Sequence, residues 1–115
     1  MIGPKVKKPT PAESRRAYER VAERSFGLCE GCGKRQATQK HHRLYRSRSG
    51  RDEVTNLLDL CLWCHSDAHM EAERTIDGWS VPSGENPAHR PVLYRGAWVF
   101  LLPDGGLDPW NEVPF

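Results

Sequence analysis

The sequence predicts a small α+β domain with one helix near its N-terminal end and a β-hairpin extension at its C-terminal end. Three observations lead to this fold class. The chain has 115 residues, which is enough for one hydrophobic core and too few for two. A helix-start pattern stands near the beginning of the chain, and short apolar runs separated by turn residues fill its last part. All elements of such a domain must share the same core.

The composition is that of a polar chain with unevenly distributed charge. Hydrophobic residues make up 37%, the mean hydropathy is −0.70, and we find neither a membrane-span pattern nor a signal-peptide pattern. We therefore expect a cytoplasmic protein without membrane contact. Residues 1–51 carry 14 Lys and Arg against 4 Asp and Glu, whereas residues 52–115 carry 3 against 11. This division favours a surface that meets a polyanion, with ordinary solvated basic side chains as the alternative.

The first expected elements are an arm and a helix. Residues 1–9 are basic, contain two prolines and show no periodicity, which is typical of a flexible basic arm. Thr10 can cap a helix, Pro11 suits its first position, and Glu13 completes a capping box. These residues predict a helix over about residues 11–25.

The remaining elements follow in chain order. Short strands are expected over residues 37–43 and 57–61, joined by a polar loop, and a second helix is expected over about residues 62–74. Glycines and prolines then interrupt regular structure. Residues 92–102 have apolar runs on either side of Arg95 and Gly96, which predicts a β-hairpin.

The four cysteines form two pairs of identical spacing, each with two residues between the thiols. Two such pairs supply the four tetrahedral ligands that zinc prefers, whereas a redox-active pair needs only one of them in a βαβ context. The sequence therefore predicts a structural zinc ion, which also adds folding free energy to a small core. The 28 residues between the pairs exceed the usual zinc-ribbon gap, so we expect the function in this insertion. The predicted zinc ligands are Cys29, Cys32, Cys61 and Cys64.

Four of the five histidines fall in two groups, one inside the insertion and one directly after the second cysteine pair. His65 and His69 are four residues apart, so they share one face of a helix and can bind one ion separate from the zinc. His41 and His42 are adjacent and would point to opposite faces of a regular strand. Both can serve one site only where the strand gives way to loop.

Together these residues resemble the HNH endonucleases, whose fold is called ββα-metal. The resemblance covers residues 27–73 and rests on the segments CEGC, KHHRL and CLWCHSDAH, with Asn56 nine residues before His65. It implies a metal-dependent DNA endonuclease that hydrolyses phosphodiester bonds in a bacterial cell or a phage-infected host. It also implies a nuclease domain over residues 10–75, including the N-terminal helix, with residues 76–115 as a β extension packed on the same domain.

The resemblance implies a role for each residue of the motif. His42 matches the general base that activates water, and Asn56 matches the residue that ties the loop and helps to orient this base. His41, His65 and His69 match ligands of a catalytic divalent ion, which would stabilise the phosphate transition state and the leaving 3′ oxygen. Mg²⁺, Mn²⁺, Ni²⁺ and Zn²⁺ all remain open, because a site of imidazoles is softer than one built for Mg²⁺ alone.

The segment after the expected base is basic and contains no acidic residue. Such side chains hold backbone phosphates, so we expect DNA binding with little base readout, by a monomer that nicks or a homodimer that cuts both strands. An ordinary basic surface loop is the alternative. The expected DNA contacts are Lys40, Arg43, Tyr45, Arg46, Arg48 and Arg51.

Two other functions are compatible with the sequence. The first is a zinc-stabilised nucleic-acid-binding module that keeps the fold without cleaving. The second is a phage packaging accessory protein that acts with a terminase or other phage proteins through the C-terminal β segment. The four grouped histidines favour the enzyme, because a protein that only binds has no need of them.

Overall fold

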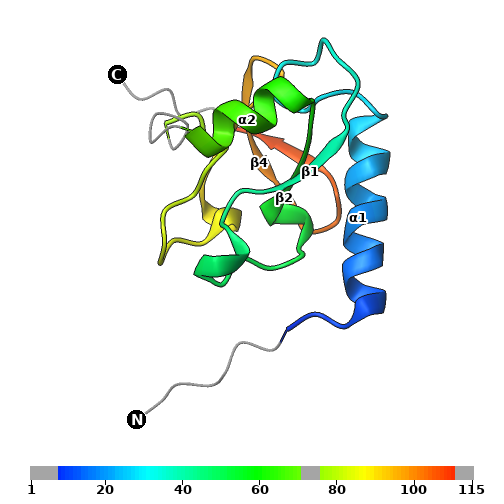
Figure 1. Cartoon of the computed structure of the whole chain (residues 1–115), viewed down its shortest axis with the longest axis vertical. Helices are drawn as coiled ribbons and strands as arrows, with labels where there is room; N and C mark the ends of the chain where they lie inside the picture. Colours follow the sequence, from blue (N-terminus) through cyan, green and yellow to red (C-terminus); the bar gives the residue numbers. More distant parts are fainter. Residues whose placement is uncertain (1–7, 71–75, 111–115) are drawn as a thin grey trace.

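The computed structural model describes residues 8–70 and 76–110, which form a small α+β fold as predicted (Figure 1). The expected basic arm lies outside the described residues except for Lys8 and Pro9, and so does the expected end of the second helix, residues 71–75. In the described part of the chain, none of the helices has the length and apolar character needed to cross a membrane. The helices and strands are α1 (Pro11–Ser25), β1 (Gln39–His42), β2 (Leu57–Leu60), α2 (Leu62–Met70), β3 (Val92–Tyr94), β4 (Ala97–Leu101) and β5 (Leu107–Pro109).

Helix α1 begins at the predicted capping box. The Glu13 amide donates to Thr10 Oγ1 at 3.1 Å, and the Thr10 amide donates to Glu13 Oε1 at 2.9 Å. These two bonds satisfy backbone donors that have no partner inside the helix. The helix buries Ala17 and Val21 against Val54 and Leu57, so it packs on the start of β2.

Strands β1 and β2 pair antiparallel, and α2 starts two residues after β2 ends and packs on both strands. The register places His41 opposite Leu58 and His42 opposite Leu57. The order of two strands and a helix is the ββα unit that the resemblance implied. The loop expected to be irregular between the strands contains two short 3-10 turns, Arg46–Arg48 and Val54–Asn56.

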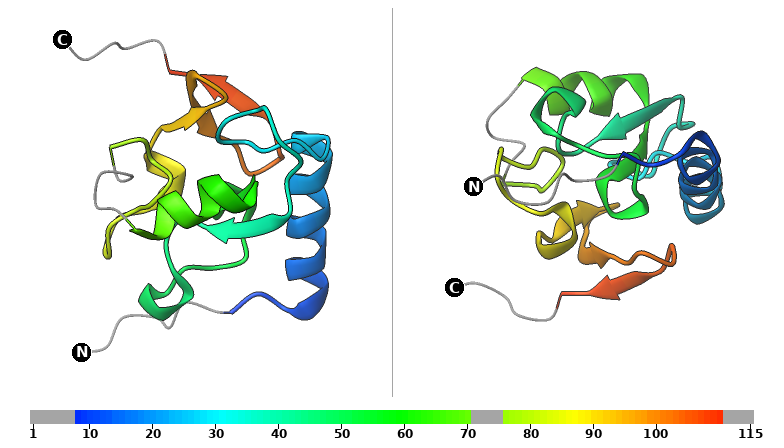
Figure 2. Two further views of the ribbon diagram at one scale, coloured as in Figure 1. Left: turned by 45° about the horizontal axis from the view of Figure 1, so that its top comes forward. Right: turned by 90° about the horizontal axis from the view of Figure 1, so that it is seen from below.

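The C-terminal strands form a second antiparallel sheet in the order β3, β4, β5. The predicted hairpin is present, and its turn residues Arg95 and Gly96 have φ values of 49° and 87°, as two-residue hairpin turns require. β5 was not expected from the sequence. Val92 and Leu101 belong to the same buried cluster as the cysteines, although α2 and this sheet lie at opposite sides of the molecule (Figure 2).

Candidate active site

The four cysteines meet where the loop before β1 approaches the start of α2. One sulfur atom from each lies within 4.8 Å of the others, and this set of thiols fits a tetrahedral zinc ion. A Cβ atom at Gly31 would lie 2.7 Å from the ring of Trp79, so only glycine fits between the two thiols of the first pair. Burial acts to raise the pKa of Cys32, but backbone hydrogen bonds from Lys34 and Arg35 lower it to about 6, which favours the thiolate that zinc needs.

His41 is buried and holds one unpaired ring nitrogen. Its side chain is 1% exposed, and its Nε2 lies 2.7 Å from the backbone carbonyl oxygen of Trp79. A carbonyl only accepts, so Nε2 carries the proton and Nδ1 carries a lone pair. Within the described residues, this buried Nδ1 has no hydrogen-bond partner. Burial, followed by the nearby His65 and His69, lowers the pKa of His41 to about 3 against the effect of the Trp79 bond, so the ring is neutral.

His65 and His69 project from one face of α2 toward His41. Their Nε2 atoms are 3.0 Å apart, and one nitrogen from each of the three rings lies within 4.8 Å of the others. Burial and the neighbouring His69 lower the pKa of His65, which also favours a neutral ring. The three imidazoles therefore offer lone pairs to one cation, in a position distinct from the cysteine cluster.

Tyr45, expected to contact DNA, packs against this cluster. Its ring stacks on the ring of His69 with centroids 5.1 Å apart and an angle of 18°, and its hydroxyl donates to the Ala68 carbonyl at 3.3 Å. Arg48 lies over the Tyr45 ring at 5.5 Å. These contacts hold the His69 ring in one orientation.

His42, expected to act as the base, is not a member of the cluster formed by His41, His65 and His69. It is the last residue of β1, and its Nε2 lies 2.6 Å from Asp52 Oδ1. Arg46 holds the same carboxylate at 3.0 and 3.3 Å. Partial burial acts to raise the pKa of Asp52, but hydrogen bonds from His42 and Ser14 and the charge of Arg46 lower it below its usual value.

Asp52 is a site residue that sequence reasoning missed. The signal available was its place as the first acidic residue after the basic segment, ten positions from His42. Spacing alone does not predict the contact, because the loop from residue 43 to residue 52 must first close on itself.

The side chain of Asn56 holds the two ends of this loop together by hydrogen bonds. It is 1% exposed. Its Oδ1 accepts from the Leu44 amide at 2.7 Å, and its Nδ2 donates to the carbonyls of Leu44 and Arg51 at 3.0 Å each. The side chain thus joins the two ends of the segment that carries the basic residues.

The prediction that Arg43 contacts DNA is wrong, because this residue is fully buried at 0% exposure. Burial, with the charges of Arg24 and Arg90, lowers its pKa to about 9. Its guanidinium ties the C-terminal segment to the ββα unit by donating to the backbone carbonyls of Thr55, Gly78, Pro87 and Arg90 at 2.7 to 3.0 Å.

The other expected DNA contacts divide by exposure. Lys40 pairs with Asp59 and lies over the ring of Tyr18, so it faces α1 and contributes to packing there. Arg46 is 65% exposed, Arg48 is exposed, and Arg51 is 33% exposed. The accessible charge of the basic segment therefore lies on these three arginines.

Comparison with known proteins identifies the unit that holds both clusters. A family model described as HNH endonuclease matches residues 29–71, which include both cysteine pairs, β1, β2 and α2. No curated protein and no solved structure matches the chain. The matched residues contain both the cysteine cluster and the histidine cluster. Their elements follow the order strand, strand, helix. Residues 29–71 therefore match the HNH endonuclease family, and the cluster of four cysteines fits a zinc-binding member of that family.

Proposed function

We propose that this protein is a metal-dependent endonuclease that hydrolyses phosphodiester bonds of DNA. The observation that carries the proposal is the buried, unpaired Nδ1 of His41 beside His65 and His69. A buried polar atom without a partner costs about 1–3 kcal/mol, and a cation held by the three rings provides the partner. The HNH domain supports a nuclease activity.

The donor set fits a divalent ion with open positions. Three neutral imidazoles suit Mn²⁺, Ni²⁺ or Zn²⁺ as well as Mg²⁺, and three protein ligands leave positions for water and substrate. When bound, such an ion stabilises the negative charge that develops on the phosphate oxygens. The hydrogen bond from His41 to the Trp79 carbonyl and the stacking of Tyr45 on His69 fix the ligand rings beforehand.

His42 takes the proton from the attacking water in this proposal. The Asp52 carboxylate accepts from His42 Nε2, which leaves Nδ1 as the accepting nitrogen. A carboxylate in this position also stabilises the imidazolium that forms when the ring takes up a proton. Arg46 and Ser14 hold Asp52 in place, so the ring orientation of His42 is set before substrate binds.

The accessible arginines of the loop bind the sugar-phosphate backbone. Arg46, Arg48 and Arg51 lie on the segment that begins directly after His42 and ends beside Asp52. Contacts of this kind carry little base specificity and give an affinity that falls as salt rises. We place the protein in the cytoplasm of a bacterial or phage-infected cell, as a monomer or homodimer.

Plasmid cleavage tests this proposal. Supercoiled DNA is incubated with the wild-type chain in Mg²⁺, Mn²⁺ or Ni²⁺, with His42→Ala as the inactive variant and His89→Ala as the matched control. His89 is an exposed histidine in a 3-10 turn outside the site. We expect cleavage by wild type and His89→Ala and none by His42→Ala. If the plasmid stays intact in every metal but the protein retards it on a gel, the result would instead support a nucleic-acid-binding module that does not cleave.

A further inference from the structure

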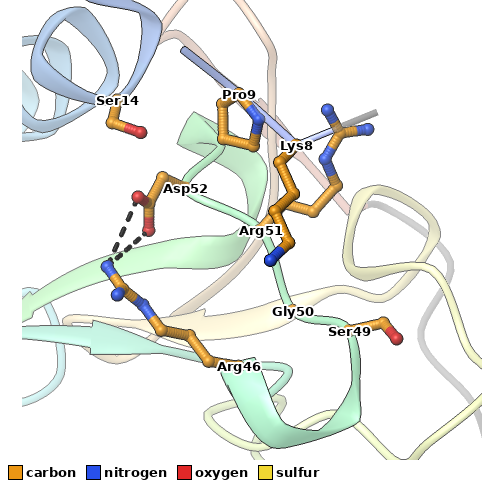
Figure 3. A pocket seen from close by; sticks show the side chains of 8 residues that line it. All are labelled: Lys8, Pro9, Ser14, Arg46, Ser49, Gly50, Arg51 and Asp52. Carbon is orange, nitrogen blue, oxygen red and sulfur yellow. Dashed lines mark hydrogen bonds and ion pairs between the residues drawn. The ribbon is translucent and has the colours of Figure 1, made fainter. Parts of the chain in front are cut away.

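A cavity of about 410 Å³ lies beside the proposed base, between the start of α1 and the loop that follows β1 (Figure 3). Its walls come from two parts of the chain that are distant in sequence. Lys8 and Ser14 line it from the α1 side, and Arg46, Ser49, Arg51 and Asp52 line it from the loop. The volume is that of a small-ligand site, large enough for a phosphate group with its attached sugar.

The cavity carries an excess of positive charge. Lys8, Arg46 and Arg51 contribute cations, and Asp52 is the single acidic residue of the lining. The Asp52 carboxylate is engaged by Arg46 and His42, and the exposed Glu53 lies 3.4 Å from Arg51 Nε just outside. Two carboxylates against three cations leave a net positive charge.

The loop that forms one wall of the cavity is held in a fixed shape by its own backbone hydrogen bonds. The Ser49 amide donates to the Arg46 carbonyl at 3.1 Å, and the Gly50 amide donates to the Tyr45 carbonyl at 2.8 Å. A Cβ atom at Gly50 would lie 1.7 Å from the Leu44 carbonyl oxygen, so no other residue fits there without moving the backbone. These contacts hold Arg46 and Arg51 on either side of the space, as Figure 3 shows.

We propose that this cavity binds a backbone phosphate, with its sugar, of the DNA strand next to the phosphate that is cleaved. Asp52 connects the cavity with the proposed base, since its carboxylate lines the cavity and accepts from His42 at 2.6 Å. A strand seated here would pass from α1 across the loop to the histidine cluster. The inference rests on the proposed function for the identity of the ligand, and it adds Lys8 and the first turn of α1 to the substrate-binding surface.

The test measures binding of a fluorescein-labelled 20-base-pair DNA duplex by anisotropy, without added divalent cation, over a series of salt concentrations. The double variant Lys8→Gln/Arg51→Gln removes two cavity cations and keeps their aliphatic stems. Lys34→Gln is the matched control, because Lys34 is exposed beside the first cysteine pair. Each phosphate contact contributes about −0.9 to the slope of log affinity against log salt. We expect the double variant to bind about tenfold or more weakly at 0.1 M salt, with a slope less negative by about 0.9, because both cations meet the same phosphate.

A second arm locates the phosphate. Single linkages of the duplex are replaced, one at a time, by an uncharged methylphosphonate. At one linkage we expect the replacement to weaken binding by wild type and by Lys34→Gln, and to leave the double variant unchanged. A third arm adds a 5′-phosphate to the strand. A loss of affinity in the double variant that is confined to this 5′-phosphorylated duplex would overturn the backbone assignment in favour of a strand end.

The proposal is wrong if the double variant has the affinity and salt slope of Lys34→Gln. Thermal unfolding of all variants checks that they fold alike. Because this experiment measures binding, its result is separate from cleavage. A wild-type chain that cleaves plasmid while the double variant binds normally rejects the cavity alone. A chain that never cleaves but loses binding in the double variant rejects the proposed function alone.

Discussion

His41 and His42 are neighbours in the chain and have opposite environments. His41 is bound to the Trp79 carbonyl, whereas His42, the last residue of β1, is bound to Asp52 of the loop. The pairing of His65 with His69 could be predicted from helical spacing. The burial of Arg43 could not, because its four carbonyl partners come from segments 12 to 47 residues away.

In the histidine cluster, His65→Ala and His69→Ala each remove one of the three imidazoles. We expect either change to weaken Ni²⁺ binding about 100-fold or more, since even the partners of ligands contribute 10- to 100-fold. Titration calorimetry measures the affinity, and elemental analysis should find the same zinc content in variant and wild type. His89→Ala serves as the control. An unchanged Ni²⁺ isotherm in both variants contradicts the assignment.

Arg43→Lys keeps the charge but cannot reach four carbonyl oxygens with one ammonium group. We expect a loss of about 3 kcal/mol in the free energy of unfolding, because buried carbonyls and a buried charge lose their partners. Chemical denaturation measures it, and Arg48→Lys on the exposed loop should change stability by less than about 0.5 kcal/mol. Equal stability of the two variants would show that Arg43 is not a structural tie.

Among the elements, α1 was predicted most fully because its start depends on residues within one turn. The hairpin was predicted for the same reason, since its turn residues lie between its strands. β5 and the 3-10 turns of the loop were not predicted. β5 is held by its pairing with β4, and the second turn is held by contacts with α1 and the C-terminal segment. Local capping and turn chemistry can be read directly from a sequence, whereas pairing set by the completed fold cannot.

Thr10→Ala removes the side-chain half of the capping box at the start of α1. We expect the free energy of unfolding to fall by about 1 kcal/mol. Urea denaturation followed by far-ultraviolet circular dichroism checks the value. Thr38→Ala, which changes an exposed threonine outside α1, is the control and should have little effect. A Thr10→Ala chain as stable as this control would contradict the cap.

Asp52 joins three elements through Ser14 of α1, Arg46 of the loop and His42 of β1. The pKa of this carboxyl is lowered in the folded state. Its contribution to stability is therefore present above the unfolded pKa of about 4 and is lost as the pH falls below it. We expect Asp52→Asn to be less stable than wild type by about 1–2 kcal/mol near pH 7.

The check is urea denaturation of wild type and Asp52→Asn over the range from neutral to acid pH. The difference between the two should shrink below about pH 4, where the wild-type carboxyl takes up its proton. A difference that stays constant across this range would mean that packing, and not charge, accounts for the effect.

At the scale of the whole molecule, the cysteine cluster and the C-terminal sheet share one core. Cys29, Cys61 and Cys64 are buried with Trp79 and with residues of β3 and β4. The paired cysteine spacing was sufficient to predict the metal cluster. It did not predict that the segment after the HNH match supplies five of the eight other buried residues of this cluster, because no local pattern relates residues so far apart.

Removal of zinc by a strong chelator is therefore expected to unfold α1, the ββα unit and the C-terminal sheet in a single transition. Structural zinc sites contribute folding free energy directly, and this core is small. Far-ultraviolet circular dichroism and the fluorescence of the four tryptophans, which include Trp79 beside Gly31, should change together. Fluorescence that changes while the helix signal persists would show that the sheet and the zinc unit are separable.

The hairpin turn also sets an order of events during protein synthesis. Arg95 donates to the backbone carbonyls of Ser25, Leu28 and Cys29 at 2.6 to 3.2 Å, across the end of α1 and the first cysteine pair. A chain leaving the ribosome has these carbonyls exposed long before Arg95 is made. The end of α1 and the first cysteine pair can thus gain these three bonds only after residue 95 has been synthesised.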